Sequence, residues 1–227
     1  MTALSCRSLS YTRPGEGHHA PSEVLRGIDA AFPPGTLSLI SGPTGAGKTT
    51  LLHLLAGLLR PTAGEMRWGE EAVSRWHAAH KDRWRRQVGI VFQHQRLLGD
   101  LTAGENVLLP LIPRRIPLRD QAAAVERALE RVGLGDKAKR PAARLSGGER
   151  QRLALARAIA VQPALLLADE PSAFQDDART AALMDLLAAE RERGAVVVVC
   201  THDPRLGSAT AVDGRYRLKR GRLEAER

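Results

Sequence analysis

The sequence predicts an α/β fold in which a mostly parallel β-sheet is flanked by helices, with an N-terminal antiparallel β part and an inserted helical subdomain. Four continuous apolar runs support this class, because uninterrupted apolar strands suit a parallel sheet covered on both faces. They occupy residues 37–40, 88–92, 164–168 and 195–200. Each run leads into polar or glycine-rich residues, and the carboxyl ends of parallel strands meet at one edge of a sheet. The four ends therefore predict a single site.

The two ends of the chain indicate the antiparallel part of the fold. Residues 1 to about 35 have the pattern of short strands. A loop rich in Gly and Pro separates them at residues 13–21. A final pair of short strands is expected around Arg220 and Gly221.

The middle of the chain, residues 94–158, differs from the rest. Prolines interrupt it, and residues 121–132 have helical composition. These features predict a mainly helical subdomain inserted into an α/β core at about 1–93 and 159–227. We expect the whole chain, 1–227, to form a single domain of this kind.

Composition indicates an ordinary globular protein, with 227 residues and 43% apolar residues. No apolar run approaches the roughly 18 to 20 residues that cross a bilayer, and residues 1–7 lack the layout of a signal peptide. We therefore expect a cytosolic protein that would reach a membrane only through a partner. The net charge of +9 could serve nucleic acid or anionic lipid. The arginines are spread along the chain, which favours solvated helix faces, and no nucleic-acid partner is expected.

The most specific motif, G-x-x-x-x-G-K-T at residues 42–49, follows the first apolar run. It precedes a helix expected at residues 50–59, before Pro61. Its glycines let consecutive N–H groups face the phosphates of a nucleoside triphosphate, aided by the helix dipole. Lys48 is expected to reach the β- and γ-phosphates, and the Thr49 hydroxyl to bind Mg²⁺. This context favours a P-loop NTPase over a simple glycine turn. The predicted contacts are Gly42, Pro43, Thr44, Gly45, Ala46, Gly47, Lys48, Thr49 and Thr50.

Two adjacent acids, Asp169 and Glu170, follow the third apolar run. Asp169 suits a carboxylate that helps to hold Mg²⁺. Glu170 should point differently, towards the attacking water, as a general base or a water-orienting group. The pair could instead cap a helix, although a phosphate loop in the same chain favours the catalytic interpretation.

The second and fourth runs deliver Gln93 and His202. The Gln93 carboxamide could supply an oxygen to Mg²⁺ and an amide to the water, because it carries both acceptor and donors. His202 could donate to the γ-phosphate and sense its loss. Taken alone, either residue also fits an ordinary polar side chain at a strand end.

A second glycine motif, Leu145-Ser146-Gly147-Gly148-Glu149, is another anion-binding layout. Ser146 at an N-cap, two glycines and a helix expected at residues 152–161 would present free N–H groups and a dipole. The S-x-x-E spacing also fits an ordinary capping box. Because one helix N-terminus already serves the phosphates, a second is needed only if it meets another face of the nucleotide.

In this order and spacing, the motifs resemble those of the nucleotide-binding subunit of an ABC transporter, over essentially the whole chain. The resemblance implies ATP and Mg²⁺ as ligands and two subunits packed head to tail. Ser146, Gly147 and Gly148, with Glu149 in the same motif, would then bind the γ-phosphate of the ATP held by the other subunit. It also implies that Tyr11 stacks on adenine.

Within this family, further segments resemble the ATPases of bacterial lipoprotein-release and macrolide-efflux transporters, together with a related cell-division ATPase. These segments are residues 24–28, 51–59, 95–98, 101–107 and 168–171. The resemblance implies an ATP-hydrolysing homodimer that drives an integral-membrane permease through the segment after Gln93. It would lie peripherally on the cytoplasmic face of the inner membrane, with lipoproteins or hydrophobic compounds as the candidate cargo.

Two other functions stay open at this point. A regulatory ATPase of the division machinery would use the same site to signal through a membrane partner. A soluble ABC ATPase acting on DNA or ribosomes would fit the positive charge. The chain lacks the long coiled coils, zinc modules or second ATPase domain that such proteins carry, which disfavours this function.

One segment, residues 172–176, departs from the family pattern. The family shows a small-residue run that ends in Leu-Asp, whereas this chain has Ser-Ala-Phe-Gln-Asp. Asp176 keeps the acid, but Phe174 and Gln175 replace a small residue and Leu. Because this segment normally contacts the partner subunit, the resemblance does not define how the two ATP sites are coupled.

Overall fold

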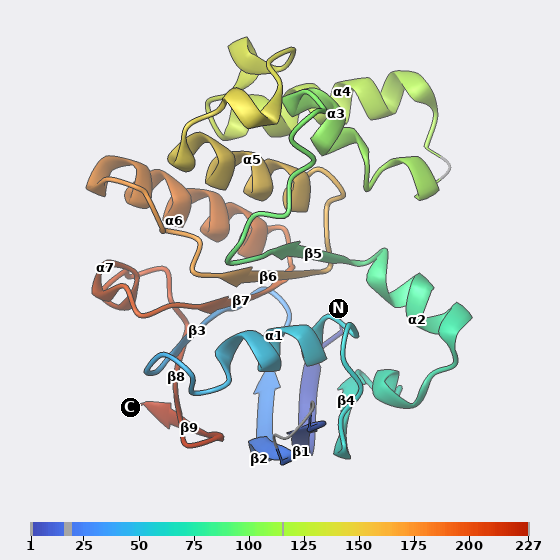
Figure 1. Cartoon of the computed structure of the whole chain (residues 1–227), viewed down its shortest axis with the longest axis vertical. Helices are drawn as coiled ribbons and strands as arrows, with labels where there is room; N and C mark the ends of the chain where they lie inside the picture. The colour runs from blue at the N-terminus through green and yellow to red at the C-terminus, as the bar shows by residue number, and fades with distance from the viewer. Residues whose placement is uncertain (1, 16–19, 115, 227) are drawn as a thin grey trace.

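A computed structural model of the chain shows two β-sheets with helices on either side (Figure 1). The structure describes residues 2–15, 20–114 and 116–226. The larger sheet has the strand order β5-β6-β7-β3-β8-β9, and the smaller one has the order β2-β1-β4. The predicted α/β class, with a mostly parallel sheet and an N-terminal antiparallel part, is confirmed.

The four apolar runs form four neighbouring strands of the larger sheet, and these strands are parallel. They are β3 (Leu37–Ser41), β5 (Val88–Val91), β6 (Leu165–Asp169) and β7 (Val196–Cys200). Strand β8 (Gly214–Lys219) continues the parallel order beside β3, and β9 (Arg222–Glu226) pairs antiparallel with β8. The last two strands are the pair predicted around Arg220 and Gly221.

Alternate side chains of the central strands pack into two separate apolar cores. On β6, Leu166 and Ala168 belong to one core, and Leu165 and Leu167 to the other. Helices α5 (Gly147–Ile159) and α6 (Asp177–Glu192) cover the first face, and α1 (Lys48–Leu55) with the smaller sheet covers the second (Figure 1). Burial on both faces explains the continuous apolar runs.

Strand β5 differs from the other three because it lies at the edge of the sheet. Its residues alternate between partly buried (Val88 and Ile90) and buried (Gly89 and Val91). One face of this strand is therefore fully covered and the other only partly, with Val88 and Ile90 packed against the second core.

The smaller sheet contains β1 (Leu4–Arg13), β2 (Ser22–Phe32) and β4 (Ala63–Trp68), all antiparallel. Strands β1 and β2 are longer than the short strands that the sequence predicts. Their pairing shifts register at several points, and such bulges interrupt the two-residue period by which a strand is recognised. Part of the predicted loop, residues 16–19, lies outside the described residues.

Residues 94–158 lie at one end of the molecule (Figure 1). Their helices are α3 (Ala103–Leu108), α4 (Leu118–Arg131) and most of α5. In the described part of this segment no residue joins either sheet. The predicted helical character is present, and its division from the core as a subdomain stays a prediction.

The remaining helices are short, and two predicted helix boundaries shift. In the described part of the chain, α2 (Ala78–Arg85) and α7 (Pro204–Gly207) are the other α-helices, and four short 3-10 helices lie at 73–75, 112–114, 135–137 and 142–144. Helix α1 ends at Leu55 rather than at residue 59, because Gly57 adopts a left-handed φ of 69° just after it. Helix α5 begins at Gly147 rather than at residue 152, because Ser146 caps it. Within the described residues, no helix combines the length and apolarity needed to cross a membrane.

Candidate functional site

A cavity of about 250 Å³ lies where the carboxyl ends of β3, β5, β6 and β7 meet, and it gathers residues from all four ends. The sequence predicted this convergence from the four apolar runs. Arg13 and Val24, from the smaller sheet, also line the cavity and were not anticipated. The lining residues are Arg13, Val24, Thr44, Gly45, Ala46, Gly47, Lys48, Thr49, Thr50, Gln93, Asp169, Glu170 and His202.

The first residue of the phosphate loop (residues 42–49) has to be glycine because of packing within the protein, and not only because a ligand must approach the backbone. Gly42 has a φ of 152°, and a Cβ placed there would lie 2.3 Å from the carbonyl oxygen of Leu218. Gly42 and Pro43 do not line the cavity, but their carbonyl oxygens accept hydrogen bonds from Nζ of Lys48, at 2.7 and 3.3 Å. The loop therefore holds the lysine beside the cavity.

The N-terminus of α1 opens into the cavity directly after this loop. Among the described residues, none caps it through a side chain, and its first turn contains no acid. Its N–H groups and dipole therefore suit an anion supplied from outside the chain.

Thr49 and Asp169 meet at the floor of the cavity. The Thr49 hydroxyl donates to Oδ2 of Asp169 at 2.6 Å. Burial raises the pKa of Asp169, and the hydrogen bond from Thr49 opposes that shift. No group of three or more Asp, Glu, His or Cys side chains in the described residues could hold a metal by itself. One hydroxyl and one carboxylate instead fit Mg²⁺, which binds few protein ligands together with substrate phosphates.

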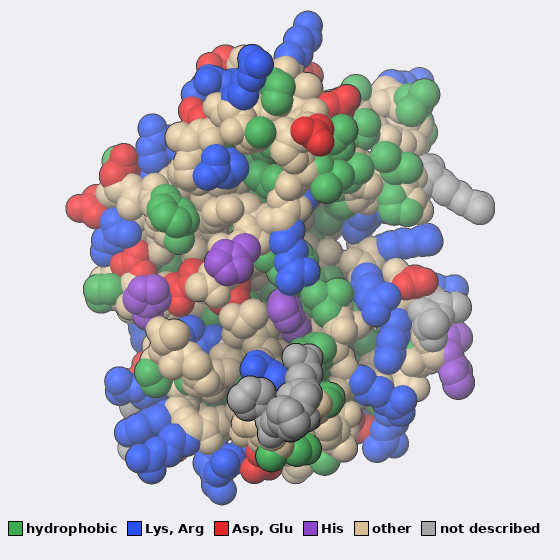
Figure 2. Space-filling model, viewed as in Figure 1, with side chains coloured by type: hydrophobic (Ala, Val, Ile, Leu, Met, Phe, Trp, Pro, Cys, Tyr) green, Lys and Arg blue, Asp and Glu red, His purple; other side chains and the backbone are tan. Residues whose placement is uncertain are grey.

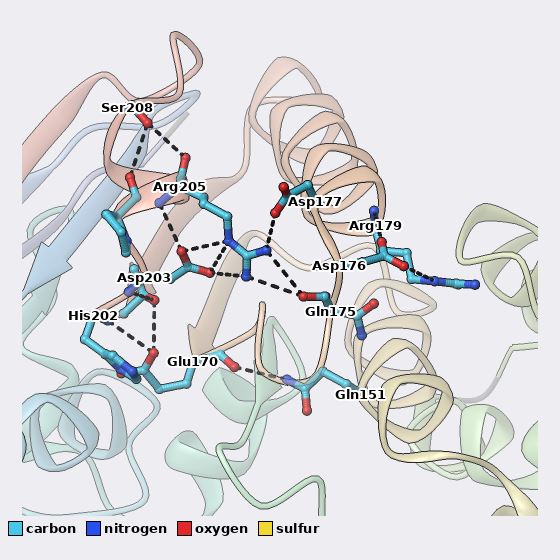
Figure 3. Close-up of polar contacts among 12 residues, drawn as sticks. Gln151, Glu170, Gln175, Asp176, Asp177, Arg179, His202, Asp203, Arg205 and Ser208 are labelled. Carbon is cyan, nitrogen blue, oxygen red and sulfur yellow. Dashed lines mark hydrogen bonds and ion pairs between the residues drawn. The ribbon is translucent and has the colours of Figure 1, made fainter.

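Glu170 follows β6 in a left-handed conformation with a φ of 49°, a strained geometry that often marks functional sites. The side chain is buried, and three groups from the loop after β7 fix its carboxylate (Figure 3). Oε2 accepts from Thr201 Oγ1 at 2.9 Å and from the His202 N–H at 3.2 Å, and Oε1 lies 2.8 Å from His202 Nδ1. Nζ of Lys48 lies 3.9 Å from Oε1.

The alternative in which these two acids cap a helix is wrong. Asp169 is the last residue of β6, and the following helix, α6, is capped instead by Asp176, whose side chain accepts from the N–H of Arg179. Neither carboxylate caps a helix, and both residues line the cavity.

Sequence reasoning missed Gln151, which links the loops around the site. Its Oε1 accepts from Gln95 Nε2 at 2.8 Å, and its Nε2 lies 3.4 Å from the main-chain oxygen of Glu170. Gln151 is buried on α5. A glutamine on the apolar face of a helix is the signal that could have indicated it, because buried amides need partners.

The second glycine motif (residues 145–149) forms the capping box that the sequence left open. Ser146 Oγ accepts from the N–H of Glu149, whose Oε2 accepts from the N–H of Ser146. Glu149 also pairs with Lys137, and this hydrogen bond is the main reason that its pKa falls to about 2. None of the residues 145–149 lines the cavity. Their nucleotide contact stays a prediction, and within one chain the two glycine motifs do not meet.

Tyr11 lies on β1 and packs, partly buried, against the core beneath the smaller sheet. It does not line the cavity, whereas Arg13 of the same strand does. Stacking of Tyr11 on adenine therefore stays a prediction.

Basic side chains occur around the whole outline of the molecule on the face in Figure 2, and they predominate over acidic ones in the lower half of that view. The absence of a nucleic-acid partner stays a prediction.

Comparison with known proteins now decides the family. The sequence family described as ABC transporter matches residues 25–173. The chain belongs to this family. It is 41% identical over 200 residues to the lipoprotein-releasing system ATP-binding protein LolD of Hydrogenovibrio crunogenus, covering 87% of this chain and 86% of that one. It is 40% identical over 184 residues to the cell division ATP-binding protein FtsE of Escherichia coli K12, covering 81% and 83%.

Solved structures agree with this assignment. A dimeric bacterial ABC transporter cassette superposes with a TM-score of 0.89 at 30% identity, covering 99% of both chains. The same cassette in a post-hydrolysis state, bound to ADP and Pi, gives a TM-score of 0.90 at 30% identity, covering 99% and 98%. The chain is thus an ABC-type ATPase subunit of the kind that includes LolD and FtsE, as the resemblance predicted.

Proposed function

We propose that the chain is a motor subunit that hydrolyses ATP with Mg²⁺ at a site completed by a second copy of itself, and that this reaction drives an integral-membrane permease. The observation that carries the proposal is the cavity in which the phosphate loop, Asp169, Glu170 and His202 converge. The second glycine motif is preorganised but lies outside this cavity. A dimer is the arrangement that gives both motifs a role.

Binding begins with the triphosphate on the phosphate loop. Lys48 exchanges its hydrogen bonds to the loop carbonyls for phosphate oxygens, and the uncapped N–H groups of α1 face the same oxygens. Thr49 and Asp169, with Gln93 nearby, would hold Mg²⁺, which supplies charge neutralisation at the phosphates.

Hydrolysis then depends on the buried carboxylate of Glu170. Thr201 and His202 hold this carboxylate in one orientation, so that it can orient the attacking water and accept its proton. His202, which lines the same cavity, would donate to the γ-phosphate. Lys48 and the N–H groups of the loop stabilise the transferring charge, and catalysis is positioning plus electrostatics.

Coupling to a membrane requires an exposed surface on the helical part of the chain. Leu98 and Ile112, on either side of α3, are both more than half exposed. Such side chains suit contact with a permease, which would bind the segment of this chain that follows Gln93. The chain would then lie peripherally on the cytoplasmic face of the inner membrane. By similarity to LolD, lipoproteins or hydrophobic compounds are the proposed cargo. By similarity to FtsE, a division-type membrane protein is the alternative partner.

Two measurements test this function. Purified protein should release phosphate from ATP in a Mg²⁺-dependent reaction, and the rate per subunit should fall on dilution because the active form is a dimer. Absence of hydrolysis even with the membrane partner present would contradict the proposal. Affinity purification from membranes should then recover a transmembrane protein, and its identity separates a transporter permease from a division-type partner.

A further inference from the structure

Arg205 joins two loops that follow neighbouring strands at the carboxyl edge of the sheet (Figure 3). Its guanidinium donates to the carboxylate of Asp203, with Nη2–Oδ2 at 2.8 Å and Nε–Oδ1 at 3.0 Å. Nη1 donates to Oδ1 of Asp177 at 2.7 Å. Both terminal nitrogens lie 3.4 Å from the main-chain oxygen of Gln175. One side chain therefore ties the loop after β7 to the segment after β6.

Gln175 extends this connection to the first turn of α5. Its Nε2 donates to the carbonyl oxygen of Gly148, in the second glycine motif, at 3.0 Å. The backbones of Gly148 and Phe174 also approach each other closely. A Cβ atom added to Gly148 would lie only 3.0 Å from the carbonyl oxygen of Phe174. The Leu that the family pattern shows at this position has no amide to donate, so this hydrogen bond is a feature of the present chain.

The other end of the connection is the catalytic loop. Asp203 follows His202 directly, and its N–H donates to Oγ1 of Thr201 at 3.0 Å. The same hydroxyl donates to the carboxylate of Glu170. The hydrogen bond from Arg205 is the main reason that the pKa of Asp203 falls to about 2, which shows that this contact favours the charged carboxylate.

We infer that Asp203, Arg205 and Gln175 form a polar relay between the loop that holds Glu170 and the second glycine motif, and that Arg205 and Gln175 are positioning residues for ATP hydrolysis. The inference rests on the proposed function, in which that motif serves the ATP of the second copy. The relay then connects the γ-phosphate end of one site to the part of the same chain that completes the other. Its role is coupling between the two ATP sites.

The contacts of the relay differ in what they contribute to folding. The Arg205–Asp177 pair adds little stability, because the Asp177 side chain is 90% exposed and that of Arg205 is 39% exposed. The Asp203 side chain is only 12% exposed and accepts two hydrogen bonds from Arg205, so this pair is the more stabilising one. Phe174, with a φ of 63° and 76% exposure, leaves the same segment open to a partner. Gln175→Leu removes only the hydrogen bond to Gly148, so this variant should fold and bind ATP while communication between sites changes.

The test measures the steady-state rate of the full-length protein against ATP concentration with Mg²⁺ present. Arg205→Ala and Gln175→Leu should each lower the Hill coefficient towards 1, because each variant breaks the relay that couples the two sites. Coupling of this kind typically changes the affinity at one site by about 5- to 150-fold when the other is occupied. The affinity for ATP of a single site, the one that contains Lys48, should stay unchanged. The double variant should behave like either single one, because both residues belong to one relay. Arg191→Ala is the matched control. Arg191 lies at the other end of α6 and forms an ion pair with Asp213.

Each outcome decides between the two claims. Cooperative wild-type hydrolysis that survives in Arg205→Ala and Gln175→Leu would overturn the relay, as would non-cooperative hydrolysis in the wild type, while the proposed function stands. A wild type that does not hydrolyse ATP even with its membrane partner present would overturn the function and the relay with it. If Arg205→Ala failed to fold, Gln175→Leu, which restores the residue of the family pattern, would decide the matter.

Discussion

The N-termini of α1 and α5 follow similar glycine-rich sequences, but they meet their hydrogen-bonding needs in opposite ways. Helix α1 begins without a side-chain cap and opens into the cavity, with Lys48 beside it. Helix α5 is closed by the reciprocal capping box of Ser146 and Glu149 and lies away from that cavity. The N-terminus of α1 can therefore bind an anion in the cavity of its own chain. The N-terminus of α5 is closed by its own side chains, and among the described residues it does not line that cavity.

Electrostatics sharpens this contrast. The first turn of α1 contains no acid, whereas that of α5 contains Glu149, paired with Lys137. An acid in the first turn already interacts with the helix dipole and leaves less of it for a ligand. Substitutions around α1 should therefore have larger effects on ATP than substitutions around α5.

The largest effect is expected at the carboxylate that faces the α1 end of the site. Glu170→Gln should lower kcat by about 10²- to 10⁴-fold, the usual contribution of a general base. ATP binding should persist, because the phosphate loop is intact. Phosphate release and equilibrium binding measure the two effects, with Glu192→Gln as the control at an exposed position on the distant end of α6. Normal phosphate release from Glu170→Gln would remove this residue from the reaction.

Lys48→Ala tests the open N-terminus itself. Loss of a charged hydrogen bond to phosphate should weaken ATP binding by about 10- to 100-fold. Isothermal calorimetry measures the affinity, and Lys219→Ala, an exposed lysine on β8, is the matched control. An unchanged affinity would contradict the phosphate-loop assignment.

Ser146→Ala and Thr102→Ala separate capping from ATP contact. Thr102 and Ser146 both form complete capping boxes, at α3 and α5. Each substitution should therefore cost about 1 kcal/mol in the free energy of unfolding. Only Ser146→Ala should also lower the hydrolysis rate, by about tenfold or less. Urea unfolding and phosphate release distinguish them, and equal rates in both variants would leave Ser146 a cap alone.

The smallest effect concerns the pH dependence of the closed N-terminus. The pKa of Glu149 falls from 4.5 to about 2, chiefly through Lys137. A depressed pKa gives stability that is complete above the unfolded value of 4.5 and is lost as the pH falls towards 2. The stability difference between wild type and Glu149→Gln should therefore shrink below pH 4.5. Urea unfolding at several pH values measures it, with Glu126→Gln on α4 as the control. A constant difference would contradict the role of this pair.

The sequence predicted the sheet and the site well because both depend on local patterns. Uninterrupted valines and leucines, as in β6 and β7, require burial on both faces, and parallel strand ends bring Gln93, Asp169, Glu170 and His202 to one edge. The bulges of β1 removed the strand period, and Gly57 ended α1 before Pro61 did.

Contacts between distant loops could not be predicted in this way. Arg205 and Asp177 are far apart in the chain, and neither lies in a motif. Gln151 contacts Glu170 only because the fold brings α5 beside the residue that follows β6. Such pairs depend on the final three-dimensional packing, and no local pattern in a single sequence specifies them.

The most direct test of the composite site mixes two inactive variants. Ser146→Arg removes the second glycine motif of one subunit, and Lys48→Ala removes the phosphate loop of the other. If each site combines both subunits, every mixed dimer keeps one intact site, and an equal mixture should recover up to about a quarter of wild-type activity. Normal hydrolysis by Ser146→Arg dimers alone, or a mixture no more active than its two components, would contradict the account.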